Sequence, residues 1–377
     1  MLRRMDTHGF DVVVVGAGIA GATAAAHLAA DRRVALIEAE DAAGYHATGR
    51  SSALWILNYG PPDVRVLTGM SKPFLEAPPQ SFVETPILSH RAVVHLAPPE
   101  QEAELRQLLA GSVGMREASV AELSALVPAL KPNYAAAGAI EEECFSIDVA
   151  ALHQGYLRQA RAGGGVLALR SRAGRIERRD GVWHVEVTGG ALFTAPLLVD
   201  AAGAWGDEVA KLAGVSPLGL SPKRRTIAVI DAAPWKIADW PAVNDVGHSW
   251  YCLPTSPRHL LVSPADETDM HPHDVQPEAL DIAIAIDRMQ QALNIEVRRV
   301  ERSWAGLRTF TPDRSLAIGR DGTAEGFFWC VGQGGFGIQT SKAAGQLLAD
   351  LVNHRDPGEA AGIVERVDPR RFAAMAA

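Results

Sequence analysis

Residues 11–30 read DVVVVGAGIAGATAAAHLAA, and this stretch decides the fold. The β-branched run 12–15 predicts a buried strand, and the alanine-rich residues after it predict a helix. Between them stand Gly16, Gly18 and Gly21 in the spacing G-x-G-x-x-G. That spacing suits a tight turn, a close approach of backbone to a pyrophosphate, and close packing of helix on strand. The stretch therefore predicts a dinucleotide-binding βαβ unit.

The next strand strengthens this interpretation. RRVALIEAE, residues 32–40, reads as a second strand that ends at Glu38, about 20 residues after the second glycine. A carboxylate there accepts hydrogen bonds from an adenosine ribose, which favours an unphosphorylated ribose as in NAD or FAD. The alternative is a solvated carboxylate at a strand end. At the start of the helix, free N–H groups and the positive dipole end would face the phosphates.

Composition limits the function classes. The chain has 377 residues, 47% hydrophobic and 21% charged, which is enough for a full core and predicts two domains. Thirty-six basic against 44 acidic residues give a net charge of -8, which opposes general nucleic-acid binding. Three widely spaced cysteines exclude a full disulfide framework and indicate a reducing, cytoplasmic location. No transmembrane segment is expected, because the glycine spacing explains the apolar N-terminal run.

A second glycine-rich loop stands near the other end of the chain. VGQGGFGIQTS, residues 331–341, reads as a strand that runs into a loop and opens a helix around Gly337. A third segment, AAGYHATGRSSALW at 42–55, reads as a polar loop that enters a helix near residues 50–52. A nicotinamide enzyme does not normally carry such a loop after its second strand.

These three segments, together with VDAAGAWG at 199–206, resemble the D-amino-acid-oxidase-like flavoenzymes, which oxidise amino acids and secondary amines with FAD. The similarity runs nearly end to end. Within the family the sequence resembles the D-arginine dehydrogenases most, through ALHQGYLR (151–158), GLSPKRR (219–225) and WAGLRTF (304–310). The resemblance implies a Rossmann-like α/β FAD-binding domain with a second, sheet-based substrate domain.

The resemblance also implies why two glycine loops are present. FAD is long: the first loop would hold its pyrophosphate, and the second would face the pyrimidine end of the flavin, where reduction places negative charge. His46 resembles the histidine that carries covalent flavin in some relatives, but the D-arginine dehydrogenases bind FAD noncovalently, which is the prediction here. The expected cofactor-binding residues are Gly16, Gly18, Ile19, Ala20, Gly21, Glu38, Ala39, Ala47, Thr48, Gly49, Arg50, Ser51, Ser52, Ala173, Gly203, Trp205, Gly334, Gly335, Gly337, Ile338, Gln339 and Thr340.

Four residues are the expected catalytic set. Arg225 and Arg308 match the family's carboxylate-binding positions, and Tyr59 and Tyr251 match its pocket tyrosines. Arginine suits this task because its planar fork binds a carboxylate bidentately and stays charged. Neighbouring residues on a strand face opposite sides, so Arg224 remains the alternative to Arg225.

Departures from the D-arginine pattern predict the substrate. Val93 stands where those enzymes place an acid toward a distant cation, and Leu54 replaces a histidine. With Ile56 and Gln339, these residues are the expected substrate-binding set and predict a pocket for neutral, apolar D-amino acids. The predicted reaction is oxidation to an imine and then to a 2-oxo acid and ammonia. Two alternatives stay open: a secondary-amine or imino-acid enzyme, and a dinucleotide-binding protein without redox turnover. The electron acceptor, a quinone, the respiratory chain or oxygen, also stays open.

The domains are expected to be discontinuous in sequence. Residues 1–56, 133–215 and 301–377 read as the FAD-binding domain, and residues 57–132 and 216–300 as the substrate domain. The acidic, histidine-containing run DETDMHPHD at 266–274 reads as a solvated loop, so no metal site is predicted.

Overall fold

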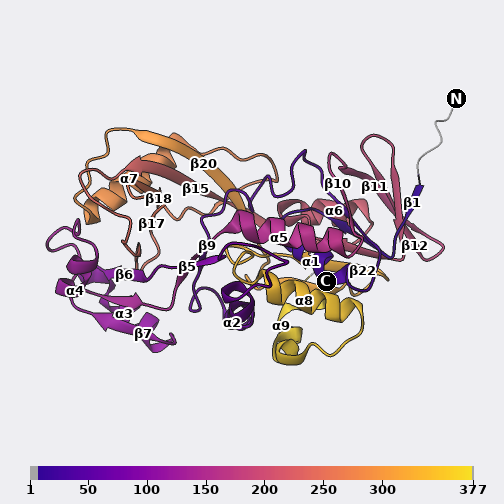
Figure 1. Cartoon of the computed structure of the whole chain (residues 1–377), viewed down its shortest axis with the longest axis horizontal. Helices are drawn as coiled ribbons and strands as arrows, with labels where there is room; N and C mark the ends of the chain where they lie inside the picture. The colour runs from indigo at the N-terminus through magenta and orange to yellow at the C-terminus, as the bar shows by residue number, and fades with distance from the viewer. Residues whose placement is uncertain (1–6, 376–377) are drawn as a thin grey trace.

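The computed structural model describes residues 7–375 of the chain. Two sheet-based parts lie side by side along its long axis (Figure 1), with the nine-stranded sheet at the left and the six-stranded and four-stranded sheets at the right. This is the mixed α/β fold that the sequence predicts. Residues 1–6 and 376–377, which the predicted FAD-binding domain includes, lie outside the described residues.

The six-stranded sheet is the dinucleotide-binding layer, and its strand order is β10-β3-β2-β14-β22-β21. All neighbours are parallel except β21, which runs antiparallel to β22. Its central strand consists of four valines that are all buried, as expected for a parallel sheet covered on both faces. The strands are β2 Val12–Val15, β3 Val34–Ile37, β10 Val166–Ala168, β14 Leu197–Asp200, β21 Ala317–Arg320 and β22 Phe327–Val331.

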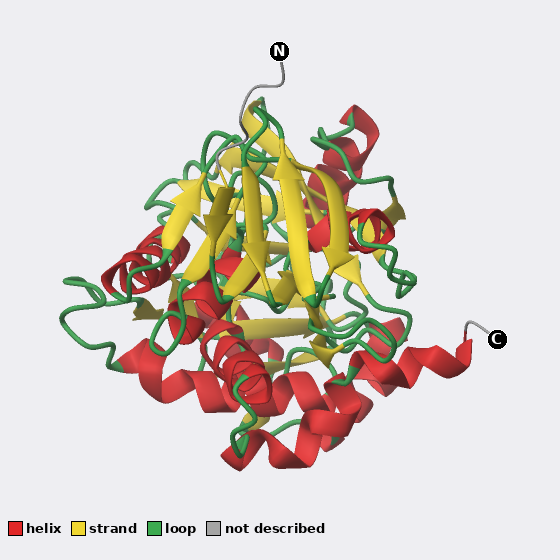
Figure 2. Ribbon diagram, turned by 90° about the vertical axis from the view of Figure 1, so that its right-hand side faces the viewer, coloured by secondary structure: helices red, strands yellow, loops and turns green. Residues whose placement is uncertain are grey.

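Three helices cover one side of this sheet, below the strands in Figure 2. The central one, α1 (Ile19–Leu28), packs against α5 (Val149–Ala162) and α8 (Ser341–Val352). Helix α1 is rich in alanine and almost wholly buried, and a Cβ on Gly345 of α8 would lie only 2.3 Å from Thr23 Oγ1. The small residues therefore let helices from the two ends of the chain approach closely.

The four-stranded sheet has the order β1-β13-β12-β11 and packs against the other side of the dinucleotide-binding sheet through an apolar cluster that includes Trp183, Phe193 and Phe327. Helix α6 also contacts it. Its strands are β1 Thr7–Gly9, β11 Ala173–Arg179, β12 Val182–Val187 and β13 Leu192–Ala195, and the helix is α6 Gly206–Leu212.

The nine-stranded sheet has the order β19-β15-β18-β17-β16-β6-β8-β7, with β20 paired along the other edge of β15. An apolar cluster with Trp250, Met289 and Leu260 packs helix α7 against one face. Its elements are β6 Val93–Ala97, β7 Met115–Ala118, β8 Ala137–Glu141, β15 Ser221–Asp231, β16 Ala242–Asp245, β17 Tyr251–Pro254, β18 His259–Ser263, β19 Thr268–Asp269, β20 Val300–Phe310 and α7 Ala279–Ala292.

The remaining elements are smaller and lie between the two parts or at their edges. A three-stranded sheet has the order β4-β9-β5, and helices α3 and α4 flank the far end of the nine-stranded sheet. The remaining bounds are β4 Leu54–Trp55, β5 Leu88–His90, β9 Phe145–Ile147, α2 Pro62–Glu76, α3 Glu102–Ala110, α4 Val120–Leu126 and α9 Val364–Val367, with short 3-10 turns η1 Pro99–Gln101, η2 Gly203–Trp205, η3 Gly358–Ile363 and η4 Pro369–Met375.

The domain boundaries differ from the predicted ones in three places. Strands β8 and β20 belong to the nine-stranded sheet, although they fall largely in segments assigned to the FAD-binding domain. Helix α2 packs on α8 and therefore lies with the dinucleotide-binding part, although it was assigned to the substrate domain. Strand pairing and helix packing of this kind depend on distant partners, which a local pattern does not reveal.

Two features of residues 7–375 bear on the function classes. No helix in this range combines the length and apolar character needed to cross a bilayer. The same residues contain no group of three or more His, Cys, Asp or Glu side chains that could hold a metal ion.

Candidate active site

A cavity of about 420 Å³ runs from the first glycine loop to the second and ends at two arginines of the nine-stranded sheet. Both glycine loops, the 44–52 segment and both parts of the fold contribute to its wall. Most of the predicted residues line it: Gly16, Gly18, Ile19, Ala20, Glu38, Ala39, Ala47, Thr48, Arg50, Ser51, Ser52, Ala173, Gly203, Trp205, Arg225, Tyr251, Arg308, Gly334, Gly335, Gly337 and Ile338. Others lie outside it: Gly21, Gly49, Leu54, Ile56, Tyr59, Val93, Gln339 and Thr340.

The first loop needs glycine for two different reasons. Gly16 has a φ of 98°, which side chains rarely adopt, and a Cβ there would lie 2.7 Å from the carbonyl oxygen of Ala201. A Cβ on Gly21 would lie 1.8 Å from the carbonyl oxygen of Gly16. Gly21 therefore serves the packing of helix on strand, while the turn at Gly16 opens the cavity.

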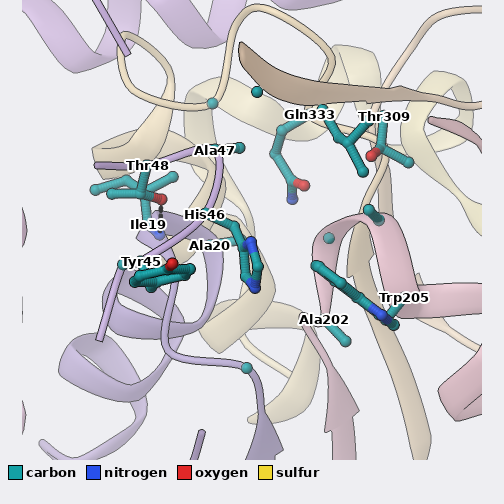
Figure 3. Close-up of a pocket in the computed structure, with 18 of the residues that line it drawn as sticks. Ile19, Ala20, Tyr45, His46, Ala47, Thr48, Ala202, Trp205, Thr309 and Gln333 are labelled. Atoms are coloured by element: carbon teal, nitrogen blue, oxygen red, sulfur yellow. Dashed lines mark hydrogen bonds between the residues drawn. The ribbon is translucent and has the colours of Figure 1, made fainter. Parts of the chain in front are cut away.

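Side chains from elsewhere hold this loop in place. Thr48 Oγ1 accepts a hydrogen bond from the Ile19 N–H over 2.9 Å at the start of α1 (Figure 3), where the N-cap residue Gly18 has no side chain to do so. Glu38 accepts bonds from the backbone N–H groups of Ala17 (2.8 Å) and Glu40 (3.0 Å). Strand β3 thus places this carboxylate beside the first loop.

His153 is a loop-positioning residue that the sequence analysis did not single out. Its Nε2 donates to the carbonyl oxygen of Ala17 over 2.9 Å from helix α5, and the side chain is buried. Burial lowers the pKa of His153, which keeps the ring neutral and suited to this single bond. The sequence gives no signal for this role, because the partner is a backbone oxygen 136 positions away.

The 43–50 segment forms consecutive turns, and no helix begins at residues 50–52 as the sequence predicted. It places His46 inside the cavity wall, where the imidazole faces the indole of Trp205 with ring centroids 4.5 Å apart (Figure 3). His46 Nε2 also lies 3.1 Å from Glu40 Oε1. Both contacts hold the ring in one orientation.

The second loop is longer than predicted. Residues 334–340 are turns, with a φ of 50° at Gly334, and helix α8 begins only at Ser341. A Cβ on Gly335 would lie 2.7 Å from the Tyr59 hydroxyl and 3.0 Å from Arg308 Nη1. Glycine at 335 thus leaves room for that pair next to the cavity.

Gln339 and Thr340 do not reach the cavity, in contrast to the prediction. Gln339 is buried, its Oε1 accepts the Ile56 N–H over 3.1 Å, and its Nε2 donates to Thr68 Oγ1 over 2.9 Å. Thr340 donates its hydroxyl to the carbonyl oxygen of Phe336 over 2.9 Å. Because the turn extends to residue 340, both side chains point into the protein and fasten the loop from behind.

Arg308 lies at the far end of the cavity on strand β20. Its Nη1 donates to the Tyr59 hydroxyl over 3.0 Å. Burial works against the charge, but Tyr59, Tyr251 and the carboxylate of Glu267 together outweigh it and raise the pKa of Arg308 above its usual value. The guanidinium therefore stays charged inside the wall and is available to an anion.

Arg225 lies on the neighbouring strand β15 and faces the same end. Its Nε donates to the carbonyl oxygen of Asp266 over 2.9 Å, and its guanidinium lies 5.9 Å from the ring centre of Tyr251. Burial, followed by the charge of Arg308, lowers the pKa of Arg225. Arg224 points to the opposite side of β15, where it pairs with Asp281 at 2.7 Å, so Arg225 is the one that lines the cavity.

The predicted apolar residues form a layer behind this end rather than its surface. Val93 is 3% exposed and belongs to an apolar cluster with Ile227, Leu54, Ile56 and Tyr251. Of these, Ile227 and Tyr251 line the cavity. Val93 therefore backs the wall, and Ile227 is the apolar contact that the sequence analysis missed.

The residues present fit FAD. A long cavity joins two glycine turns, and at Gly16 and Gly335 a Cβ would meet backbone or side-chain atoms that form its wall. At the arginine end, the buried Tyr251 hydroxyl and Thr309 Oγ1 have no hydrogen-bond partner among the described residues and both side chains line the cavity. Such donors suit the polar edge of a bound molecule.

Comparison with known proteins agrees with this geometry. The family model described as FAD dependent oxidoreductase (DAO) matches residues 11–351. Glycine oxidase from Geobacillus kaustophilus has the same fold, with a TM-score of 0.81, 22% identity, and coverage of 93% of this chain and 96% of that one.

Two curated relatives are each 25% identical. FAD-dependent oxidoreductase domain-containing protein 1 from Xenopus laevis aligns over 178 residues, which is 41% of this chain and 34% of that protein. Hydrogen cyanide synthase subunit HcnC from Pseudomonas aeruginosa aligns over 235 residues, which is 62% of this chain and 54% of that protein. The alignments thus span about a third and about half of these relatives. Because the family model covers most of the chain, this protein belongs to the DAO family of FAD-dependent oxidoreductases.

Proposed function

We propose that this oxidoreductase oxidises neutral, apolar D-amino acids to 2-oxo acids and ammonia. The observation that carries the proposal is the pair Arg308 and Arg225, which meet at one end of a cavity that starts at the dinucleotide loop. Two guanidinium groups on adjacent strands suit a carboxylate, because each can present a planar fork of donors. A free amino acid carries that carboxylate next to the carbon that is oxidised.

The roles of the chain's own residues follow from their positions. Arg308, held by Tyr59, and Arg225, held by Asp266, bind the carboxylate and fix the orientation of Cα. The two positive charges also disfavour the ammonium form of the bound amine, which leaves the neutral amine with the lone pair that forms the C=N bond. FAD, when bound, supplies the acceptor for the hydride that leaves Cα. Water then adds to the imine carbon, and hydrolysis gives the 2-oxo acid and ammonia.

The proposed side-chain specificity rests on the apolar layer described above. Ile227 lines the cavity, and Val93 and Leu54 pack behind it, so an apolar substrate side chain gains about 0.8 kcal/mol for each buried CH₂. A guanidinium or ammonium placed against this layer would lose its solvation without a partner. Preference for the D enantiomer is supported by the resemblance to the D-arginine dehydrogenases.

The test is anaerobic mixing of the holoenzyme with D-Leu, D-Met, D-Phe, their L enantiomers, D-Pro and N-methyl amino acids. Loss of the oxidised flavin absorbance with the D-amino acids alone is the expected result. Bleaching only by L-amino acids would overturn the enantiomer assignment, and bleaching only by D-Pro or N-methyl compounds would show a secondary-amine enzyme. A flavin that no compound in the panel reduces would exclude the oxidation of apolar and secondary amino acids and so overturn the proposal.

A further inference from the structure

The segment 270–278 connects β19 to α7 without helix or strand of its own. His273 and Val275 from this segment line the cavity, as do most residues of the 44–52 segment. One wall of the cofactor cavity is therefore an irregular segment of the substrate-binding part. Side-chain contacts hold this segment against the dinucleotide-binding part.

Arg50 provides the main connection. Its Nη1 donates to the carbonyl oxygens of Val275 (3.1 Å) and Ala305 (3.0 Å), and its Nη2 donates to Asp274 Oδ1. The Arg50 carbonyl oxygen in turn accepts the indole N–H of Trp304 over 2.9 Å. Arg50, a predicted cofactor-binding residue, lines the cavity, and these contacts engage its guanidinium with the substrate-binding part.

Tyr45 completes the connection from the same turn segment. Its hydroxyl donates to Asp274 Oδ2 over 3.2 Å, and the Arg50 guanidinium lies 5.2 Å from the centre of its ring. Both carboxylate oxygens of Asp274 are thus held by residues of the dinucleotide-binding part. The hydrogen bond from Arg50 is also the main reason that the pKa of Asp274 is lowered.

The Arg50–Asp274 ion pair is exposed enough to break and re-form in solution. The Arg50 side chain is 15% exposed and the Asp274 side chain is 47% exposed. A partly exposed ion pair of this kind is worth little compared with a buried one, and salt screens it. The contacts can therefore break without unfolding either part.

We propose that Asp274, Arg50 and Tyr45 form a latch that holds the 270–278 segment over bound FAD and sets the rate at which the cofactor leaves. FAD in this cavity would lie against His273 and Val275, and the 270–278 segment has no helix or strand of its own, so contacts that hold the segment in place oppose dissociation of the cofactor. Asp274 acts as a positioning residue, since it acts through the segment that it anchors. The proposal depends on FAD binding and is independent of the substrate.

The experiment follows FAD release from the purified holoenzyme after dilution, by the rise of free FAD fluorescence. Asp274→Asn removes the charge and should accelerate release about fivefold, the upper end of the loss expected for a partly exposed ion pair. Tyr45→Phe should accelerate it about threefold. In the double variant the two effects should combine to less than their product, because both act on one carboxylate. Asp274→Glu should recover part of the wild-type rate.

The matched control is Asp269→Asn, which removes an exposed ion pair with Lys223 in the neighbouring strand, away from the cavity. Its release rate should equal that of wild type. Added salt should accelerate release from wild type and leave the Asp274→Asn rate nearly constant. Wild-type release from Asp274→Asn, equal acceleration in Asp269→Asn, or the same salt response in both proteins would each overturn the latch.

Discussion

Arg308 Nη1 donates a hydrogen bond over 3.0 Å to the hydroxyl of Tyr59, a residue 249 positions earlier in the chain. The contact brings strand β20 and the segment before α2 together at the end of the cavity. It fixes one edge of the guanidinium fork and leaves other N–H groups available for a ligand. Three of the predictions below concern this end of the cavity.

Arg308→Ala should lower the efficiency of flavin reduction by roughly two orders of magnitude or more while FAD stays bound, because removing the partner of a desolvated carboxylate costs about 2 to 5 kcal/mol. Arg308→Lys should recover only part of the loss, since lysine has the charge without the bidentate fork. Stopped-flow reduction measures the effect. Arg302→Ala, an exposed position on the same strand, is the control and should reduce like wild type. Wild-type rates in Arg308→Ala would show that the carboxylate binds elsewhere.

Tyr59→Phe should reduce kcat/KM by about tenfold, less than the loss of Arg308 itself, because one hydrogen bond to a charged group is lost and the charge remains. The double variant with Arg308→Ala should be no worse than Arg308→Ala alone, since Tyr59 acts on the same guanidinium. Steady-state kinetics on one D-amino acid measures both. Fully additive losses would mean that Tyr59 contacts the substrate independently.

FAD should be released by acid precipitation, with the yellow colour in the supernatant. His46 is held by a tilted ring contact with Trp205 and a 3.1 Å contact with Glu40, so we expect the ring to have a packing role without a bond to the cofactor. His46→Ala should therefore still bind FAD, with weaker retention. Flavin that remains with the precipitated wild-type protein and is lost from the pellet in His46→Ala would establish a covalent link.

Apolar substrates should be preferred over basic ones. D-Leu, D-Met and D-Phe are expected to give higher kcat/KM than D-Arg and D-Lys, measured at one pH because only the neutral amine is oxidised. Ile227→Ala should cost D-Leu about tenfold and D-Ala much less, since the lost contact is with the side chain. D-Arg as the best wild-type substrate would mean that a carboxylate pairs with it, and would refute the apolar assignment.

Helix packing predicts a pH dependence of stability at His27. Burial, assisted by the charge of Lys342, lowers the pKa of His27 to about 4, and its Nδ1 lies 2.8 Å from the carbonyl oxygen of Thr23. In the unfolded chain the His27 imidazole is protonated near pH 6.5, about its ordinary pKa. In the folded protein it is protonated only near pH 4. The stabilisation is therefore complete above pH 6.5 and is lost as pH falls through this window.

The lowered pKa of His27 should contribute about 1 to 2 kcal/mol to the free energy of unfolding. This is less than the pKa shift alone would give, because the side chain is partly exposed and solvent screens it. His27→Gln should flatten the change in unfolding free energy between pH 7 and pH 5, measured by urea denaturation. The comparison of variant with wild type cancels the carboxylates that titrate in both. An unchanged slope in His27→Gln would exclude His27 as the source.

The sequence predicted the parts of the site whose chemistry is local. Gly16 and Gly21 follow a spacing rule that describes one turn and its helix, and the structure places both in the expected roles. The same holds for the strands of the dinucleotide-binding sheet, where buried β-branched runs stand next to turn signals. Arg225 also faces the cavity, as strand alternation allowed but did not decide.

The rest depended on contacts between distant segments. Gln339 was expected at the ligand, but the turns before it continue to residue 340 and direct its amide to Ile56 and Thr68. Arg50, a predicted cofactor-binding residue, lines the cavity, but the partners of its guanidinium, Asp274 and Val275, come from a different part of the fold. Neither the contacts of Gln339 nor those of Arg50 have a periodic or compositional signal in the sequence. His153 was passed over for the same reason, because its partner is a backbone oxygen far away in sequence.

The contact of α1 with α8 has a consequence for biosynthesis. Thr23 Oγ1 donates to the Ser341 carbonyl oxygen over 3.0 Å, and strand β14 lies between β2 and β22 in the sheet. Helix α5 and strand β14 are translated earlier, but an emerging polypeptide lacks the α8 partner of its nucleotide loop until the ribosome has translated residues beyond 341. We expect a nascent chain arrested before that point to bind no flavin, so cofactor loading follows translation of nearly the whole chain.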